Sequence, residues 1–335
     1  MSDANRILSD LKQQKYNSVY FLMGEEAYFI DQIANYIQEN VLQAHERDFN
    51  QTIVYGRDTT IEDIVGAAKR YPMMAEKQVV IVKEAQELSR TIEKLADYVL
   101  NPTESTVLVI CYKYKKLDKR KALAKALAKV KAEMVEFKSL YENQVGDWIT
   151  KQMNEKGYRI EPKAAYLLVE FLGANLSNIA NELSKLQIIL PVGTHITPDH
   201  IEENIGISKD FNVFELNKAI GNMEIVKARK ITNYFMQNPK DHPNVVTVAM
   251  LYNFFIKVMQ FHGLTDKSER NAASKLKVNP YFVKDYITAA KNYPMKKVSF
   301  IIEKIREADL KSKGVGATPL SQNDVLKELL SQIFG

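Results

Sequence analysis

The chain has 335 residues, of which 46% are apolar and 26% are charged, a composition that excludes wholesale disorder and a collagen-like chain. The 46 basic and 41 acidic residues give a net charge of +5, which permits contact with nucleic acid or an acidic protein but does not require it. The single cysteine, Cys111, excludes an intrachain disulfide and a thiolate zinc site, and is typical of a cytoplasmic protein.

The first 140 residues alternate short apolar runs with helical patterns. Strands are expected at 19–23, 52–55, 78–82, 106–110 and 134–137, and helices at 27–42, 60–70, 89–100 and 118–131. Several of these strands are apolar almost without interruption, as expected for parallel strands that are buried on both faces. The alternation of strands and helices therefore predicts a mainly parallel sheet covered by helices on both sides.

Only helical patterns follow after about residue 140. Helices are expected at 163–172 and 176–190, after Thr197-Pro198, and at 244–262, 297–310 and 324–334. The predicted fold class is therefore α/β plus all-α. No unbroken run of about 18 apolar residues occurs, and the N-terminus lacks the apolar core of a signal peptide, so no contact with a membrane is expected.

The junction after the first strand, Gly24-Glu25-Glu26, stands where a phosphate-binding loop would be. Such a loop needs glycines for close backbone approach, a lysine for the phosphates and a hydroxyl for magnesium. This junction has one glycine and two carboxylates, which suit a helix N-terminus but repel phosphate. We therefore expect a degenerate phosphate-loop position and no bound cofactor.

Other catalytic or metal-binding patterns are weak. None of the five histidines forms a helical pair spaced by four residues, so we expect no metal site. Cys111 ends an apolar strand and is interpreted as a small core residue rather than a nucleophile. No residue is therefore assigned a catalytic role.

The connection before the third strand, Tyr71-Pro72-Met73-Met74, is unusually apolar for a loop. Proline restricts its backbone, and methionine side chains adapt to irregular pockets on a partner. The two methionines could instead fold back onto the core of their own domain, and the sequence leaves these two interpretations open.

A second candidate binding feature is the basic segment 113–131, which contains nine basic residues and one acid. Lys121, Lys125 and Lys129 recur every four residues, so they lie along one helix face and could follow the phosphates of a nucleic acid. No aromatic residues interleave with them, so a solvated outer helix face is the alternative that the pattern favours.

Several motifs in this order resemble the delta subunit family of the bacterial DNA polymerase III clamp loader. The resemblance covers nearly the whole chain and is carried by VYFLMGEE at 19–26, YPMMAEKQVV at 71–80, KLDKR at 116–120, LSNIANELSKL at 176–186, VFEL at 213–216 and ADLKSKG at 308–314. Each motif is short, and their order and spacing make the resemblance specific.

The resemblance implies three domains. Residues 1–140 would form an AAA+-like α/β domain that has no working phosphate loop, 141–210 a small helical lid domain, and 211–335 a helical collar domain that packs against sister subunits. The chain would not catalyse a reaction by itself within the DNA-directed DNA polymerase holoenzyme. Its partners would be the sliding clamp (beta subunit), the gamma/tau and delta-prime subunits of the loader, and primed DNA within the complex.

The resemblance also implies a site. By position, Tyr71, Pro72, Met73 and Met74 would bind the clamp, and the two methionines would enter a pocket on its surface. Many relatives have an aliphatic residue followed by phenylalanine here, so Met74 departs from the pattern. Two alternatives stay open: an active clamp-loader ATPase, and a separate nucleic-acid-binding protein that uses the basic helix.

Overall fold

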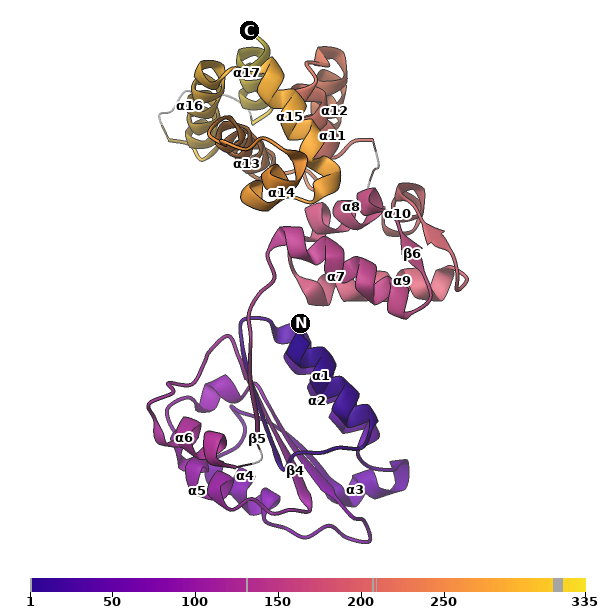
Figure 1. Cartoon of the computed structure of the whole chain (residues 1–335), viewed down its shortest axis with the longest axis vertical. Helices are drawn as coiled ribbons and strands as arrows, with labels where there is room; N and C mark the ends of the chain where they lie inside the picture. The colour runs from indigo at the N-terminus through magenta and orange to yellow at the C-terminus, as the bar shows by residue number, and fades with distance from the viewer. Residues whose placement is uncertain (1, 131, 207, 209, 316–321) are drawn as a thin grey trace. The chain divides into compact units, whose positions relative to one another are not determined.

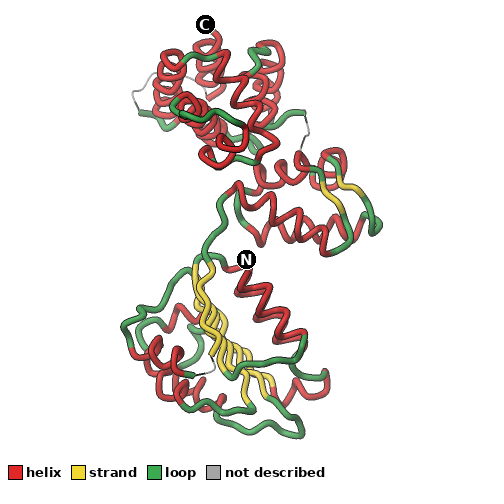
Figure 2. The backbone as a smooth tube through the Cα atoms, viewed as in Figure 1, coloured by secondary structure: helices red, strands yellow, loops and turns green. Residues whose placement is uncertain are grey.

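The computed structural model describes residues 2–130, 132–206, 208, 210–315 and 322–335, and the chain divides into two compact units, 1–140 and 141–335. The first unit contains a five-stranded sheet in the order β2-β3-β4-β1-β5, in which every pair is parallel (Figure 2). Its strands are β1 (Val19–Gly24), β2 (Gln51–Tyr55), β3 (Gln78–Lys83), β4 (Thr106–Lys113) and β5 (Ala132–Phe137).

Helices cover both faces of this sheet, as the sequence predicted. On one face lie α1 (Ser2–Lys12) and α2 (Ala27–Asn40), and on the other lie α4 (Ile61–Ala68), α5 (Ala96–Leu100) and α6 (Ala122–Lys129) (Figure 1). The short helix α3 (Arg47–Asn50) leads directly into β2. Strands β1, β3 and β4 are buried along nearly their whole length, which explains their continuous apolar sequence.

Two helix predictions in this unit were too long. In place of a helix at 89–100, the chain forms 3₁₀ turns at Ala85–Leu88 and Ile92–Leu95 before α5 begins. The Thr91 hydroxyl donates to the Leu88 carbonyl at 3.3 Å, and such side-chain bonds compete with the helical pattern. Similarly, α6 begins four residues later than expected, because the Asp118 carboxylate accepts from the Arg120 amide at 3.0 Å and forms a turn first.

The second unit begins with a group of helices around Trp148, which is almost completely buried. The group consists of α7 (Glu142–Glu155), α8 (Pro162–Leu172), α9 (Leu176–Ile189) and α10 (Pro198–Ile205). It also contains a parallel pair of two-residue strands, β6 (Arg159–Ile160) and β7 (His195–Ile196), although no strand was expected after residue 140. Two residues are too few for a detectable period, so no sequence pattern could indicate this pair.

The rest of the second unit packs around one apolar cluster formed by residues 213–333. Its helices are α11 (Val213–Gly221), α12 (Ile225–Gln237), α13 (Asn244–His262), α14 (Glu269–Leu276), α15 (Val283–Asn292), α16 (Met295–Ser312) and α17 (Gln322–Phe334). The predicted fold class, α/β plus all-α, is therefore confirmed. The further division into a lid and a collar near residue 210 stays a prediction.

Helix α13 is long and apolar enough, by length and composition alone, to cross a membrane, which the search for unbroken apolar runs did not anticipate. In the folded chain α13 packs against α11, α15, α16 and α17. Leu251, Phe255 and Val258 are completely buried in this cluster. The apolar residues of α13 therefore form part of the protein core, as expected for a helix with several packed neighbours.

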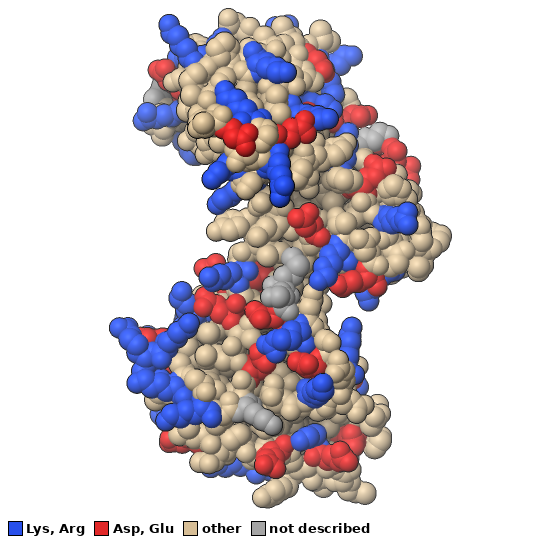
Figure 3. All heavy atoms as spheres, in the orientation of Figure 1, with Lys and Arg blue, Asp and Glu red and all other residues tan. Residues whose placement is uncertain are grey.

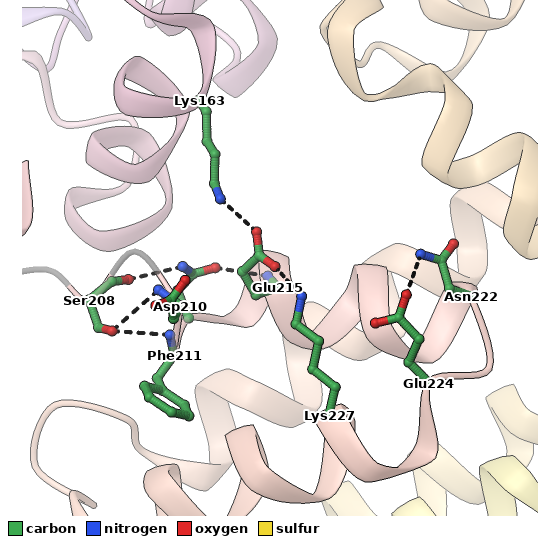
Figure 4. Close-up of polar contacts among 9 residues, drawn as sticks. Lys163, Ser208, Asp210, Phe211, Glu215, Asn222, Glu224 and Lys227 are labelled. Carbon is green, nitrogen blue, oxygen red and sulfur yellow. Dashed lines mark hydrogen bonds and ion pairs between the residues drawn. The ribbon is translucent and has the colours of Figure 1, made fainter. Parts of the chain in front are cut away.

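A buried carboxylate joins the two helical groups of the second unit. Glu215 at the start of α11 accepts from Lys163 of α8 at 2.8 Å and from Lys227 of α12 at 2.6 Å (Figure 4). Burial by itself raises the pKa of Glu215, but the two lysine hydrogen bonds outweigh this effect and hold the pKa below its usual value. Glu215 is therefore charged at neutral pH and ties α8 to α11.

Candidate functional site

The α4–β3 connection, which carries the predicted clamp-binding residues, begins at a firmly held helix end. The carbonyl of Ala68, the last residue of α4, accepts from the Tyr98 hydroxyl at 3.2 Å, the Thr106 hydroxyl at 2.8 Å and the Gln78 side-chain amide at 3.3 Å. Gln78 is buried and also donates to the carbonyl of Arg70. Because Gln78 is the first residue of β3, one side chain ties both ends of the connection together.

The middle of the connection is held by Asn50, a buried residue at the end of α3. Its side-chain oxygen accepts from the Met73 backbone N–H at 2.6 Å. Its side-chain nitrogen donates to the Met73 carbonyl at 2.9 Å and to the Glu46 carbonyl at 3.0 Å. Both backbone polar groups of Met73 are therefore satisfied by one side chain, as they would be by a neighbouring strand.

The apolar side chains of the connection point into solvent. Tyr71 is 83% exposed, Met73 61% and Met74 100%, while Pro72 is half-buried. The interpretation that the methionines fold back onto the core is therefore wrong. Met74 has a φ of 54°, a left-handed conformation that costs a residue other than glycine about 1–2 kcal/mol. Strained backbone of this kind is found preferentially at functional sites.

Two residues of this region were missed by sequence reasoning. Phe49 is 71% exposed and directly precedes Asn50, so it leaves the backbone beside the same connection. Asn50 lies 23 residues before Met73 in the chain, and no local pattern links the two. Phenylalanine is usually buried and asparagine usually exposed, and these two neighbours show the reverse. The sequence alone does not reveal this reversal, which is seen only in the fold.

The degenerate phosphate-loop position lies at the opposite edge of the same sheet, where the parallel strands end. Gly24 has a φ of 120°, and a Cβ atom there would lie 2.2 Å from the Phe137 carbonyl oxygen. The same carbonyl accepts from the Glu26 backbone N–H at 3.1 Å. Gly24 therefore allows β1 and β5 to approach each other closely.

The N-terminus of α2 is occupied by a carboxylate of the chain itself. Glu26 caps the helix by accepting from the Tyr28 backbone N–H at 3.3 Å, and Glu25 beside it is exposed. Burial raises the pKa of Glu26, while the bond from Tyr28 opposes this shift. A phosphate at this helix end would have to displace or approach a carboxylate, which is electrostatically unfavourable.

A partly exposed network of ion pairs lies at the same edge of the sheet. Lys113 at the end of β4 contacts Asp31 of α2 at 2.9 Å and Glu84 after β3 at 2.8 Å. Burial by itself lowers the pKa of Lys113, but the two carboxylates outweigh it and raise the pKa above its usual value. The positive charge of Lys113 at this edge is thus paired with carboxylates of the chain itself.

The three lysines of the predicted basic face lie along one exposed side of α6. Lys121 precedes the helix, and Lys125 and Lys129 follow at intervals of four residues, opposite the buried Leu123 and Leu127. Figure 3 shows basic side chains gathered on the side of the N-terminal unit that carries α6. The last residue of the predicted segment, Lys131, lies outside the described residues.

Within the described residues, no group of three or more His, Cys, Asp and Glu side chains is arranged to hold a metal ion. Cys111 is completely buried in β4, and this burial raises the pKa of its thiol to about 12. Such a thiol is protonated and unreactive at neutral pH, so it acts as a core side chain.

Comparisons with known proteins identify the family of this chain. The family model described as "DNA polymerase III, delta subunit" matches residues 20–138, and the one described as "DNA polymerase III delta subunit, C-terminal domain" matches residues 210–321. Together they match more than half of the chain. The chain belongs to the DNA polymerase III delta subunit family. The first match contains the α4–β3 connection and all of the five-stranded sheet except Val19, the first residue of β1.

Individual members of the delta family are similar over most of their length. DNA polymerase III subunit delta of Bacillus subtilis (strain 168) is 27% identical over 318 residues, which cover 92% of this chain and 91% of the relative. The probable DNA polymerase III subunit delta of Aquifex aeolicus (strain VF5) is 24% identical over 263 residues, which cover 75% of this chain and 72% of the relative.

A solved structure of the delta family supports the fold. The DNA clamp loader delta protein YqeN of Bacillus subtilis aligns with a TM-score of 0.58 and 25% identity, covering 99% of both chains. This chain therefore combines a parallel-sheet unit with helical regions, and its fold is similar to that of this clamp loader delta protein.

Proposed function

We propose that this chain binds the sliding clamp of the bacterial replicase and opens it, so that the clamp can be loaded on primed DNA. The observation that carries the proposal is the exposure of Met73 and Met74 on a connection whose backbone is fixed by buried side chains. Membership of the delta family supports the assignment of this connection to the clamp.

Burial of the two methionines would supply a substantial part of the binding energy. Each side chain contributes about 1.5–3 kcal/mol when it moves from water into an apolar pocket. The pair would contribute about 3–6 kcal/mol, which is close to the cost of association of about 4 kcal/mol or more, so tight binding needs further contacts. Tyr71 and Phe49 are exposed beside the methionines and offer that additional apolar area.

Opening of the ring requires differential binding. A ligand shifts a closed ring toward an open one only if it binds the open form more tightly. A rigid apolar connection can do this when it fits a pocket whose shape is strained in the closed ring. The held backbone of Met73 suits this role better than a flexible loop would, because little ordering entropy is lost on binding.

Hydrolysis of ATP is assigned to partner subunits in this proposal. The Glu26 cap and the Lys113 ion pairs occupy the edge of the sheet where a nucleotide would bind, which argues against an active ATPase. The gamma/tau and delta-prime subunits would contact the C-terminal helices as a collar, and the complex would act in the cytoplasm.

Contact with primed DNA is assigned to Lys121, Lys125 and Lys129. Within the loader, reversal of these three charges to glutamate is expected to weaken DNA binding about tenfold and to reduce its salt dependence, because phosphate contacts release counterions. A fluorescence titration of labelled primed DNA at several salt concentrations measures this. Strong, salt-sensitive DNA binding by the isolated chain would instead favour a separate nucleic-acid-binding protein.

The clamp contact is tested by the double substitution Met73→Asp and Met74→Asp. Both side chains are exposed, so the fold should be retained, while buried charges should weaken clamp binding by about 100-fold or more. Titration of the cognate clamp by calorimetry gives the affinity, and circular dichroism checks the fold. A matched control replaces Ile188 and Val192 of the helical region, which are also exposed and apolar, with aspartate. Unchanged clamp affinity in the first variant would remove the assigned site.

A further inference from the structure

We propose that Asn50 is a positioning residue for clamp binding: its side-chain amide holds the backbone N–H and C=O of Met73 so that both methionines face outward. This inference rests on the proposed function and concerns how the binding connection is prepared before it meets the clamp. Asn50 itself is 4% exposed, so it acts through Met73 rather than by touching a partner.

The orientation of the Asn50 amide is determined by its three hydrogen bonds. The nitrogen donates to two carbonyls, of Met73 and Glu46, and the oxygen accepts from the Met73 N–H. A flipped amide would face its oxygen toward both carbonyls and its nitrogen toward an N–H group, and all three bonds would be lost. The observed orientation is therefore the one that the surrounding backbone permits.

The same bonds offset the energetic cost of the strained backbone at the next residue, Met74. Met74 adopts a left-handed conformation that methionine enters only at a cost. Between Gln78, which ties the ends of the connection, and Asn50, which ties its middle, the chain has few other conformations available. Without Asn50, Met74 is free to relax, and the two side chains are no longer held in their exposed positions.

Two substitutions separate positioning from simple stability. Asn50→Leu keeps the approximate shape and removes all three bonds. Asn50→Asp keeps the acceptor for the Met73 N–H but places an oxygen against the two carbonyls.

The expected result is a clamp affinity that falls about tenfold in Asn50→Leu, with a smaller loss in Asn50→Asp, since each hydrogen bond contributes modestly. Amide hydrogen exchange of the free chain provides a readout that does not depend on the clamp. The Met73 N–H should be protected in the wild type and in Asn50→Asp, and should exchange rapidly in Asn50→Leu. A general loss of stability would instead raise exchange throughout β2 and β3.

A double-mutant cycle distinguishes failure of this inference from failure of the proposed function. In a chain that carries Met73→Asp and Met74→Asp, Asn50→Leu should cause no further loss of clamp affinity, because Asn50 acts only through the two methionines. If the aspartate pair abolishes binding while Asn50→Leu binds as the wild type does, the positioning role is wrong and the site stands. If the aspartate pair has no effect, the proposed function itself fails.

Discussion

Two connections of the same sheet differ in what they present to solvent. At the edge where the strands end, the β1–α2 junction is closed by Gly24, Phe137 and the Glu26 carboxylate, and little of it remains available to a ligand. At the other edge, the α4–β3 connection uses buried polar side chains to hold apolar ones in solvent. The position where a phosphate-binding loop would lie is thus filled by structural contacts, whereas the α4–β3 connection presents apolar side chains to solvent and is the interaction site that we propose.

The largest expected effect on stability comes from changing Gly24. The substitution Gly24→Ala places a methyl group 2.2 Å from the Phe137 carbonyl and forces alanine to a φ of 120°. We expect unfolding to become easier by about 3 kcal/mol or more, because steric overlap and backbone strain add. Urea denaturation measures the change.

Gly66 in α4 is the matched control for this substitution. A Cβ atom there meets nothing within 4 Å, so Gly66→Ala should stabilise the chain by about 0.5–1 kcal/mol through helix propensity. Equal effects of the two alanines would mean that the close approach of β1 and β5 is not required, and the proposed structural role of the β1–α2 junction would be lost.

A smaller effect is expected from Glu26→Gln, which keeps the acceptor for the Tyr28 N–H but removes the charge. The pKa of Glu26 is raised in the folded state, so folding favours its protonated form. Wild-type stability should therefore gain a contribution as the pH falls from neutral through that pKa, and lose it as the pH rises. The variant should lack this contribution.

Denaturation of the wild type and Glu26→Gln at several pH values isolates this contribution, because other carboxylates are common to both chains. A wild type that becomes less stable than the variant as the pH falls through this range would show that the Glu26 charge is favoured by the fold. The N-terminus of α2 would then behave as an anion-binding site, and the β1–α2 junction would not be closed to an anionic ligand.

Much of the fold could be predicted from the sequence, because strands such as 78–82 and 106–110 consist of one polar residue followed by an unbroken apolar run. The stretch 85–95 could not, since its 3₁₀ turns depend on a local hydroxyl bond and on packing. The pair β6–β7 was too short to leave a pattern.

Only part of the candidate site could be predicted from the sequence. Pro72, Met73 and Met74 are conspicuous in a connection, but their exposure depends on Asn50, which is distant in the chain and ordinary in type. Sequence reasoning gives the composition of a segment, whereas the direction of its side chains follows from long-range hydrogen bonds. Phe49 was missed for the same reason.

The most direct test of the account compares two forms of the cognate sliding clamp in one titration series. One form is locked shut by a cross-link across its ring interface, and the other is made monomeric by substitutions at that interface. We expect the chain to bind the monomeric form about tenfold or more tightly, because only preference for the open shape can drive opening. Equal affinity for the locked and the monomeric clamp would contradict the account.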